Sequence, residues 1–178
     1  LFRSILGSDL IGFHTYDYAR HFINSAKQIL NIDSVLNHIE YKERTIKIDC
    51  FPMGIDFKKY HNALLNPQII KEQNDILDKC KNKKIILSID RLDYTKGILQ
   101  RLSSFKIFLK KYPEYIENVI LILVAVPTRS NIRNYKKLKR KIDKIIGNIN
   151  GEFGKIGWNP IWYLYRSLPF NKLVSLYS

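Results

Sequence analysis

The chain has 178 residues, of which 46% are hydrophobic and 26% charged, and its formal net charge is +14 at pH 7. This length and apolar fraction are enough to fill a sizeable core, which excludes a disordered or fibrous protein. No apolar run approaches the ~18 residues that a membrane helix needs, and the N-terminus lacks a signal-peptide layout, so we expect a cytoplasmic protein with no membrane partner.

The first part of the chain predicts a strand, a helix and a hairpin. Residues 9–15, DLIGFHT, are typical of a short buried strand, and Tyr16–Leu30 carries apolar residues at helical spacing. Thr15 is expected to cap this helix, because its hydroxyl can accept a free N–H of the first turn. Residues 35–51 then alternate as strands do, with a hairpin around YKER. The predicted apolar side of the helix consists of Ala19, Phe22, Ile23, Ala26 and Ile29.

The second part begins where FPMGID (51–56) interrupts the pattern, as a crossover between lobes does. Two helical runs follow, at 57–65 and 67–79, and strands then alternate with helices. The predicted order is strand Lys84–Asp90, helix Gly97–Lys111, strand Val119–Val126, helix Ile132–Ile149, strand Trp158–Leu164 and helix Phe170–Tyr177. This alternation predicts an α/β fold with a parallel sheet flanked by helices. The loops that follow the strands then share one edge, where open α/β sheets bind ligands.

A glycine-rich stretch, INGEFGKIGWNP (149–160), connects the predicted helix Ile132–Ile149 to the predicted strand Trp158–Leu164. It lacks the lysine-serine ending of a P-loop. We therefore interpret it as a tight turn that leads into the following strand, with Gly151, Gly154 and Gly157 all in the turn.

The positive charge on its own suggests a polyanionic partner such as nucleic acid. Much of it lies in Tyr135–Lys144, within a predicted helix whose apolar residues form one stripe. The stripe consists of Ile132, Tyr135, Leu138, Ile142, Ile145 and Ile149. The basic residues Lys136, Lys137, Arg140 and Lys144 then point outward, as on a solvated helix face. Because charge alone is weak evidence, we expect no nucleic-acid partner.

Two cations stand where a strand ends and a helix begins, in KKIILSIDRLDYTKGI (83–98). Arg91 leaves the carboxyl end of the strand, and Lys96 and Gly97 lie at the start of the helix, whose free N–H groups and dipole favour an anion. Gly97 also permits close approach of the backbone to a ligand. These features predict a seat for a phosphate or diphosphate. The alternative is an ion pair of Arg91 with Asp90 or Asp93 and a merely exposed Lys96.

A second strand-end loop follows LILVAV and presents Arg129 at the same edge of the sheet. Two neighbouring loops that each offer an arginine indicate two anionic groups bound close together. The alternative is a helix-capping or surface arginine, which is common in proteins.

Other chemical signals are weak in this sequence. Cys50 and Cys80 have no C-x-x-C spacing, so we expect two reduced structural thiols. The histidines have no metal-ligand spacing, and His14 fits a hydrogen-bonded core or cleft residue as well as a functional one. The hydrolase, dehydrogenase and zinc-protease motifs G-x-S-x-G, G-x-G-x-x-G and H-E-x-x-H are absent.

Six ordered segments together resemble the trehalose-6-phosphate synthases, a family of retaining glycosyltransferases. The segments are DLIGFHTYDYARHF, FPMGID, DRLDYTKGI, AVPTR, INGEFGKIGWNP and YLYRSLPF, and they extend over nearly the whole chain. The match is poorest between Asn31 and Lys47. Any one segment would be weak evidence, whereas six in order are specific.

The resemblance implies a two-lobed, Rossmann-like fold of the GT-B type. It also implies transfer of glucose from UDP-glucose to glucose 6-phosphate, giving α,α-trehalose 6-phosphate and UDP, with no essential metal or other cofactor. Arg91, Lys96 and Gly97 match the positions at which the family holds the UDP diphosphate. Of these three, Arg91 and Lys96 are the implied catalytic residues. Arg129 matches the arginine that binds the acceptor phosphate, and Leu168 falls where the family contacts uracil through the backbone.

The same resemblance assigns the chain to parts of the two lobes. Residues 1–55 correspond to the end of the acceptor-side lobe, 56–82 to the connection between lobes, and 83–178 to the first half of the nucleotide-sugar lobe. The family's glycine-rich donor loop and its acidic ribose-binding loop have no counterpart here, so we expect these 178 residues alone to be inactive. Met53 and Cys50 replace other apolar residues, a change of little consequence.

A second hypothesis is a catalytically silent regulatory homologue that binds sugar phosphates or a partner enzyme. The presence of Arg91, Lys96 and Arg129 argues against it, because a silent copy has no chemical need for all three. The sequence leaves open whether the protein forms a homo-oligomer or a complex with trehalose-6-phosphate phosphatase.

Overall fold

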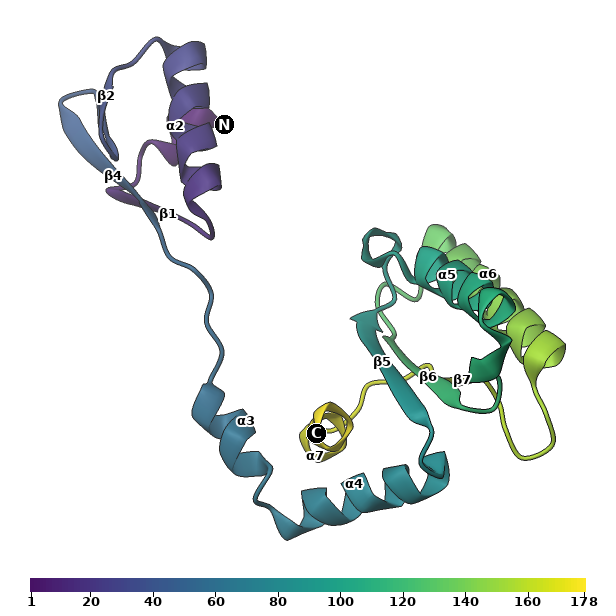
Figure 1. Ribbon diagram of the computed structural model, residues 1–178. Coiled ribbons are helices and arrows are strands. Elements are labelled where there is room, and N and C mark those ends of the chain that lie inside the picture. The colour runs from purple at the N-terminus through teal and green to yellow at the C-terminus, as the bar shows by residue number, and fades with distance from the viewer. The chain divides into compact units, whose positions relative to one another are not determined.

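The computed structural model describes residues 1–178, which divide into two compact units, Leu1–Asp56 and Phe57–Ser178. We call them the N-terminal unit and the C-terminal unit and describe each by itself (Figure 1). No helix has the length and apolar character that crossing a membrane requires.

The N-terminal unit packs helix α2 against a four-stranded sheet of order β1-β4-β3-β2 (Figure 1). Its elements are α1 (Phe2–Ile5), β1 (Leu10–Phe13), α2 (Tyr16–Leu30), β2 (Ser34–Val35), β3 (His38–Tyr41) and β4 (Arg44–Cys50). Strands β1 and β4 are parallel, whereas β4–β3 and β3–β2 are antiparallel. The sheet is therefore mixed.

Local signals explain these elements well. Helix α2 has the predicted bounds, and the Thr15 hydroxyl caps it by accepting the Tyr18 N–H at 3.3 Å. The predicted hairpin is confirmed: Lys42 and Glu43 connect β3 to β4 with φ angles of 52° and 60°, as a tight hairpin turn requires. One detail of the predicted apolar side is wrong, because Ile29 is 62% exposed.

The C-terminal unit contains a three-stranded parallel sheet of order β5-β6-β7. Its elements are α3 (Phe57–Ala63), α4 (Pro67–Cys80), β5 (Lys84–Arg91), η1 (Tyr94–Lys96), α5 (Ile98–Lys111), η2 (Pro113–Tyr115), β6 (Val119–Val126), α6 (Arg133–Phe153), β7 (Ile161–Leu164) and α7 (Phe170–Tyr177). The predicted βαβ alternation and parallel sheet are confirmed. Helices α3 and α4 belong to this unit, and α4 packs against α7.

Helices cover both faces of this sheet, because β6 is buried on both sides. Alternate residues of β6, such as Leu121, pack with α5 and α6, while the residues between them, such as Ile122, pack with α4 and α7. Figure 1 shows α5 and α6 side by side on one face of the sheet, and α4 and α7 together on the other. The carboxyl ends of the strands remain free of these helices, which leaves one edge for the strand-end loops.

The glycine-rich stretch departs from the prediction, because α6 extends through Gly151 to Phe153. Ile149 is fully buried and Phe153 also packs on the core, so the apolar stripe continues the helix past the expected end. The turn begins at Gly154, where a Cβ would collide with the Asn150 carbonyl oxygen. At the other end of the helix, Ile132 is 48% exposed and lies outside the stripe.

Strand β7 consequently begins at Ile161, three residues later than predicted. Trp158 instead forms an isolated antiparallel bridge with Lys155, and its indole N–H donates to the Val119 carbonyl at 3.1 Å. The Asn150 side chain accepts the Ile161 N–H and donates to the Ile161 carbonyl, both at 3.0 Å. This pair of bonds joins the last turns of α6 to the start of β7.

Candidate functional site

Strands β5 and β6 end side by side at the carboxyl edge of their sheet. Arg91 and Val126 are register partners, and the Leu92 N–H donates to the Val126 carbonyl at 2.8 Å. The β5–α5 loop, with Arg91 and Lys96, therefore lies beside the β6–α6 loop, with Arg129. The structure thus brings these sequence-predicted residues to one edge.

The β5–α5 loop is a short 3₁₀ turn that Asp93 closes. The Asp93 Oδ1 accepts both the backbone N–H and the hydroxyl of Thr95, at 2.9 Å and 2.8 Å. These bonds from Thr95, together with those from Tyr135 and the charge of Arg129, hold the pKa of Asp93 below its ordinary value. Lys96, the last residue of the turn, is therefore held in a fixed backbone position.

Gly97 follows with a left-handed backbone, φ 64°, and stands at the N-cap of α5. A residue with a side chain adopts this conformation only with strain, which explains the glycine. As glycine it offers no capping side chain, so the first N–H groups of α5 lack the usual side-chain acceptor. Such a helix N-terminus can accept an anionic oxygen.

The side chain of Arg91 is exposed and makes no ion pair with either neighbouring carboxylate. Asp90 binds Arg101 instead, and Asp93 is engaged in its own turn and with Tyr135. The predicted alternative, a structural pair of Arg91 with Asp90 or Asp93, is therefore wrong. Asp93 instead closes the loop that follows Arg91.

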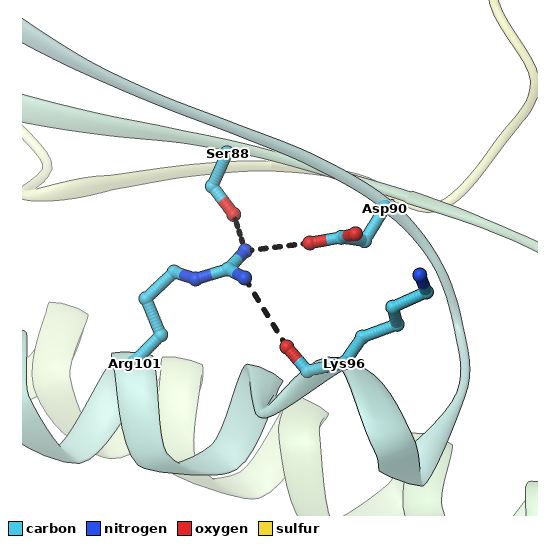
Figure 2. Close-up of polar contacts among 4 residues, drawn as sticks. All are labelled: Ser88, Asp90, Lys96 and Arg101. Atoms are coloured by element: carbon cyan, nitrogen blue, oxygen red, sulfur yellow. Dashed lines mark hydrogen bonds and ion pairs between the residues drawn. The ribbon is translucent and has the colours of Figure 1, made fainter. Parts of the chain in front are cut away.

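Arg101 is a residue that the sequence analysis missed (Figure 2). Its guanidinium, projecting from α5, donates to Asp90 Oδ2 at 2.9 Å, to the Ser88 hydroxyl, and to the Lys96 carbonyl at 3.2 Å. Figure 2 shows the Lys96 carbonyl directed at Arg101, while the Lys96 ammonium has no contact drawn. Arg101 therefore joins β5 to the turn. The available signal was Asp90 itself, since an acid at the end of an apolar strand needs a cationic partner.

Arg129 lies in the connection between β6 and α6 and has a left-handed backbone conformation, φ 47°. Its Nη1 donates to the Tyr135 hydroxyl at 3.2 Å, and its Cζ lies 5.8 Å from the centre of the Tyr135 ring. The Tyr135 hydroxyl in turn donates to Asp93 Oδ2 at 3.0 Å. Arg129 is thus connected to the β5–α5 loop through one phenol, which the sequence analysis assigned only to the apolar stripe.

The two loops together form a cationic edge. Arg91, Lys96 and Arg129 are exposed, and none of them forms an ion pair with a carboxylate. The nearby carboxylates are engaged elsewhere, Asp90 by Arg101 and Asp93 by its turn. Charge that the protein leaves unneutralised at the carboxyl edge of a parallel sheet is suited to an anionic ligand.

Leu168 lies in the β7–α7 connection and is half-buried. It lines a cavity of about 440 Å³ between the sheet and helices α4 and α7, together with Trp162 and Leu164 of β7. None of Arg91, Lys96 and Arg129 lines this cavity. Leu168 and the three cations therefore do not share this cavity.

Comparisons with known proteins agree over the whole chain. The profile of glycosyltransferase family 20 matches residues 1–178. The UDP-forming alpha,alpha-trehalose-phosphate synthase of Candida albicans is 43% identical over 179 residues, a match that includes 100% of this chain and 37% of the relative. The chain thus spans little more than a third of that relative's length.

Two solved structures show the same fold. An alpha,alpha-trehalose-phosphate synthase of Burkholderia xenovorans in complex with glucose-6-phosphate matches with a TM-score of 0.90 and 25% identity, over 99% of this chain and 39% of that one. The N-terminal domain of Candida albicans trehalose-6-phosphate phosphatase matches with a TM-score of 0.87 and 28% identity, over 98% of this chain and 38% of that one.

These matches confirm the predicted fold class, the α/β architecture of a GT-B-type glycosyltransferase with parallel strands flanked by helices. They also explain why the six sequence segments occur in order, since the family profile extends from the first residue to the last. Because the family profile matches residues 1–178 and a relative is 43% identical over all of this chain, the chain belongs to glycosyltransferase family 20.

Proposed function

We propose that the chain acts, as part of a longer protein, in a UDP-forming trehalose-6-phosphate synthase. The enzyme transfers glucose from UDP-glucose to glucose 6-phosphate and releases α,α-trehalose 6-phosphate and UDP. The observation that carries this proposal is the cationic edge, where Arg91, Lys96 and the uncapped start of α5 lie beside the Arg129 loop. The full-length relatives that match the chain carry the name of this enzyme.

Arg91, Lys96 and the α5 N-terminus hold the diphosphate of the donor in this proposal. Negative charge grows on the diphosphate as the bond to glucose breaks, so fixed cations there stabilise the transition state more than the ground state. The turn that carries Lys96 is held by Asp93 on one side and by Arg101 on the other. Such a preorganised group loses little free energy to reorientation during the reaction.

Arg129 binds the phosphate of glucose 6-phosphate and so positions the acceptor. Its planar guanidinium can hold a phosphate through two parallel hydrogen bonds, which fixes orientation as well as distance. The bond to Tyr135 occupies Nη1 and leaves other N–H groups free for a ligand. Correct orientation brings the acceptor hydroxyl to the anomeric carbon.

The two acids of the β5–α5 region are poor candidates for a covalent nucleophile. Asp90 forms an ion pair with Arg101, and Asp93 accepts bonds from Thr95 and Tyr135. This supports retention through a reaction on one face of the sugar, in which the departing phosphate helps to deprotonate the acceptor. The proposal assigns charge neutralisation to the cations and not to a metal, so we expect activity to persist in the presence of EDTA.

A catalytically silent homologue is the alternative, and one observation favours it. A trehalose-6-phosphate phosphatase N-terminal domain has the same fold at 28% identity, so the fold alone does not separate synthases from such domains. The partners proposed earlier, a second copy of the chain or a trehalose-6-phosphate phosphatase, apply to either function. Light scattering with and without the phosphatase tests both.

A coupled assay of UDP release by the full-length enzyme tests the proposed function. We expect UDP release that requires both UDP-glucose and glucose 6-phosphate, with trehalose 6-phosphate formed in equal amount. The matched control omits glucose 6-phosphate and measures hydrolysis of the donor by water. Binding of both ligands without any UDP release would favour the silent homologue.

A further inference from the structure

The hydroxyl of Tyr135 joins Arg129 of the β6–α6 loop to Asp93 of the β5–α5 loop, which precedes Tyr135 by 42 positions in the sequence. It accepts a hydrogen bond from Arg129 Nη1 at 3.2 Å and donates one to Asp93 Oδ2 at 3.0 Å. The tyrosine itself is 4% exposed and belongs to α6. A buried helix residue therefore connects the exposed side chain of Arg129 to the β5–α5 turn.

Both ends of this connection lead to predicted ligand contacts. Asp93 uses its other oxygen to close the turn that ends at Lys96, through the N–H and hydroxyl of Thr95. At the other end, Arg129 has a left-handed backbone, which is strained for a residue with a side chain and needs surrounding contacts to persist. The phenol supplies one such contact by hydrogen bonding and a second by lying under the guanidinium.

A phenol suits this place better than a carboxylate would. An acid beside Arg129 would neutralise the guanidinium and compete with a bound phosphate, whereas a neutral hydroxyl orients the arginine and leaves its positive charge. Asp93 forms no ion pair with the arginine, and the Tyr135 hydroxyl hydrogen-bonds to both. The two hydrogen bonds of the Tyr135 hydroxyl thus orient the side chains of Arg129 and Asp93 without an ion pair between Arg129 and an acid.

We propose that Tyr135 is a positioning residue that couples the acceptor-phosphate arginine to the turn that holds the donor diphosphate. A phosphate on Arg129 fixes the guanidinium, and through the phenol it steadies Asp93 and the turn ending at Lys96. This inference rests on the proposed function of Arg129 and Lys96. Its structural part, the coupling of the two loops, stands on the hydrogen bonds alone.

Tyr135→Phe tests the inference, because it removes the hydroxyl and keeps the ring in its packing against Tyr94. In the full-length enzyme we expect KM for glucose 6-phosphate to rise roughly tenfold and kcat to fall several-fold, in line with the loss of a hydrogen bond to a charged group. The matched control is Tyr115→Phe, a half-buried tyrosine at the other end of the sheet for which no hydroxyl partner is found. We expect it to leave both constants unchanged.

A double-mutant cycle separates coupling from simple structural support. If the phenol acts through Arg129, Tyr135→Phe has little further effect on KM for glucose 6-phosphate in an Arg129→Ala background. Equal effects of Tyr135→Phe in both backgrounds would mean that the tyrosine only supports the fold, and the inference would be overturned.

Hydrogen exchange of the Thr95 amide provides a readout that does not depend on activity. That amide donates to Asp93, so we expect faster exchange in Tyr135→Phe than in the parent and the Tyr115→Phe control. Unchanged Thr95 exchange would overturn the coupling whatever the enzyme does. Absence of UDP release by the parent would instead refute the proposed function, while faster Thr95 exchange would still support the coupling.

Discussion

Arg101 forms an ion pair with Asp90, with 2.9 Å between Nη1 and Oδ2, and the same guanidinium donates to the carbonyl of Lys96. The side chains are 38% and 22% exposed, so the pair is partly shielded from water. It has two consequences for the cationic edge. Asp90 does not neutralise Arg91, and the turn that carries Lys96 is held to the start of α5.

Replacement of Arg101 by alanine is expected to lower both stability and turnover. The change leaves Asp90 without a partner and frees the Lys96 carbonyl, so we expect a loss of about 1–3 kcal/mol in the free energy of unfolding. We also expect kcat to fall roughly tenfold, because Lys96 loses its fixed position. Thermal unfolding and the UDP-release assay measure the two effects.

Two further variants test whether the losses in Arg101→Ala come from the Asp90–Arg101 ion pair or from the removal of any arginine. Asp90→Asn in the Arg101→Ala background should recover part of the stability, since it removes the unpaired charge. Arg140→Ala removes an exposed arginine of α6 that makes no ion pair, and should change little. A loss in Arg140→Ala as large as that in Arg101→Ala would contradict the assignment.

If Arg91 holds the donor diphosphate and Arg129 the acceptor phosphate, as we propose, loss of the two arginines has different effects on the kinetics. Arg91→Ala should lower kcat by about 10²–10³-fold, because it removes charge from the leaving diphosphate. Arg129→Ala should chiefly raise KM for glucose 6-phosphate, by roughly 10- to 100-fold, because it removes a charged contact to the acceptor. Steady-state kinetics with each substrate varied in turn measure both effects, and the opposite pattern would show that the two sites are exchanged.

Much of the fold follows from local signals in the sequence. Helix α2 has its predicted bounds because the Thr15 cap and the apolar period both lie within the element. Strand β6 likewise has its predicted bounds, since a continuous apolar run flanked by polar residues is typical of a strand buried on both faces. The placement of Arg91 and Arg129 at one edge then follows from the geometry of parallel strands, without any knowledge of side-chain contacts.

The contacts among the site residues could not be predicted in the same way. Arg101 meets Asp90, and Tyr135 meets Asp93, only because tertiary packing brings separate elements together. The period of α6 identifies Tyr135 as a buried residue but gives no sign of where its hydroxyl points. Helix α6 ends later than predicted for a related reason: Gly151 weakens a helix locally, but the packing of Ile149 and Phe153 extends it.

Gly97 provides a test of the loop backbone that leaves its side-chain contacts intact. Its φ is 64°, and the nearest atom to an added Cβ would be Gln100 Oε1 at 3.9 Å, so a substitution meets backbone strain and no collision. We expect Gly97→Ala to reduce the free energy of unfolding by about 1–2 kcal/mol and Gly97→Asn by less, because asparagine tolerates this conformation. KM for UDP-glucose should also rise, and more in Gly97→Ala than in Gly97→Asn.

The matched control for this prediction is Gly147→Ala in helix α6. Gly147 has open space around its Cβ position and an ordinary helical backbone. Alanine there is expected to stabilise the protein by roughly 0.5–1 kcal/mol. Denaturant unfolding of both variants gives the comparison, and destabilisation at Gly147 with none at Gly97 would reverse the expected order.

Asp93 gives the site a defined dependence on pH. Bonds from the N–H and hydroxyl of Thr95, from Tyr135, and the charge of Arg129 lower its pKa in the folded protein from an ordinary 3.8. A lowered folded pKa means that the stabilisation is fully present above the unfolded value and is lost as the pH falls through the folded value. We therefore expect the thermal midpoint of Asp93→Asn to lie below that of the parent by a constant amount from about pH 7 to pH 5, and the gap to close below about pH 4.

The matched control is Asp33→Asn. Asp33 is an exposed acid with no hydrogen bond or ion pair, so the thermal midpoint of this variant should follow that of the parent at every pH. A gap for Asp93→Asn that widens in acid would show that the carboxylate destabilises the turn.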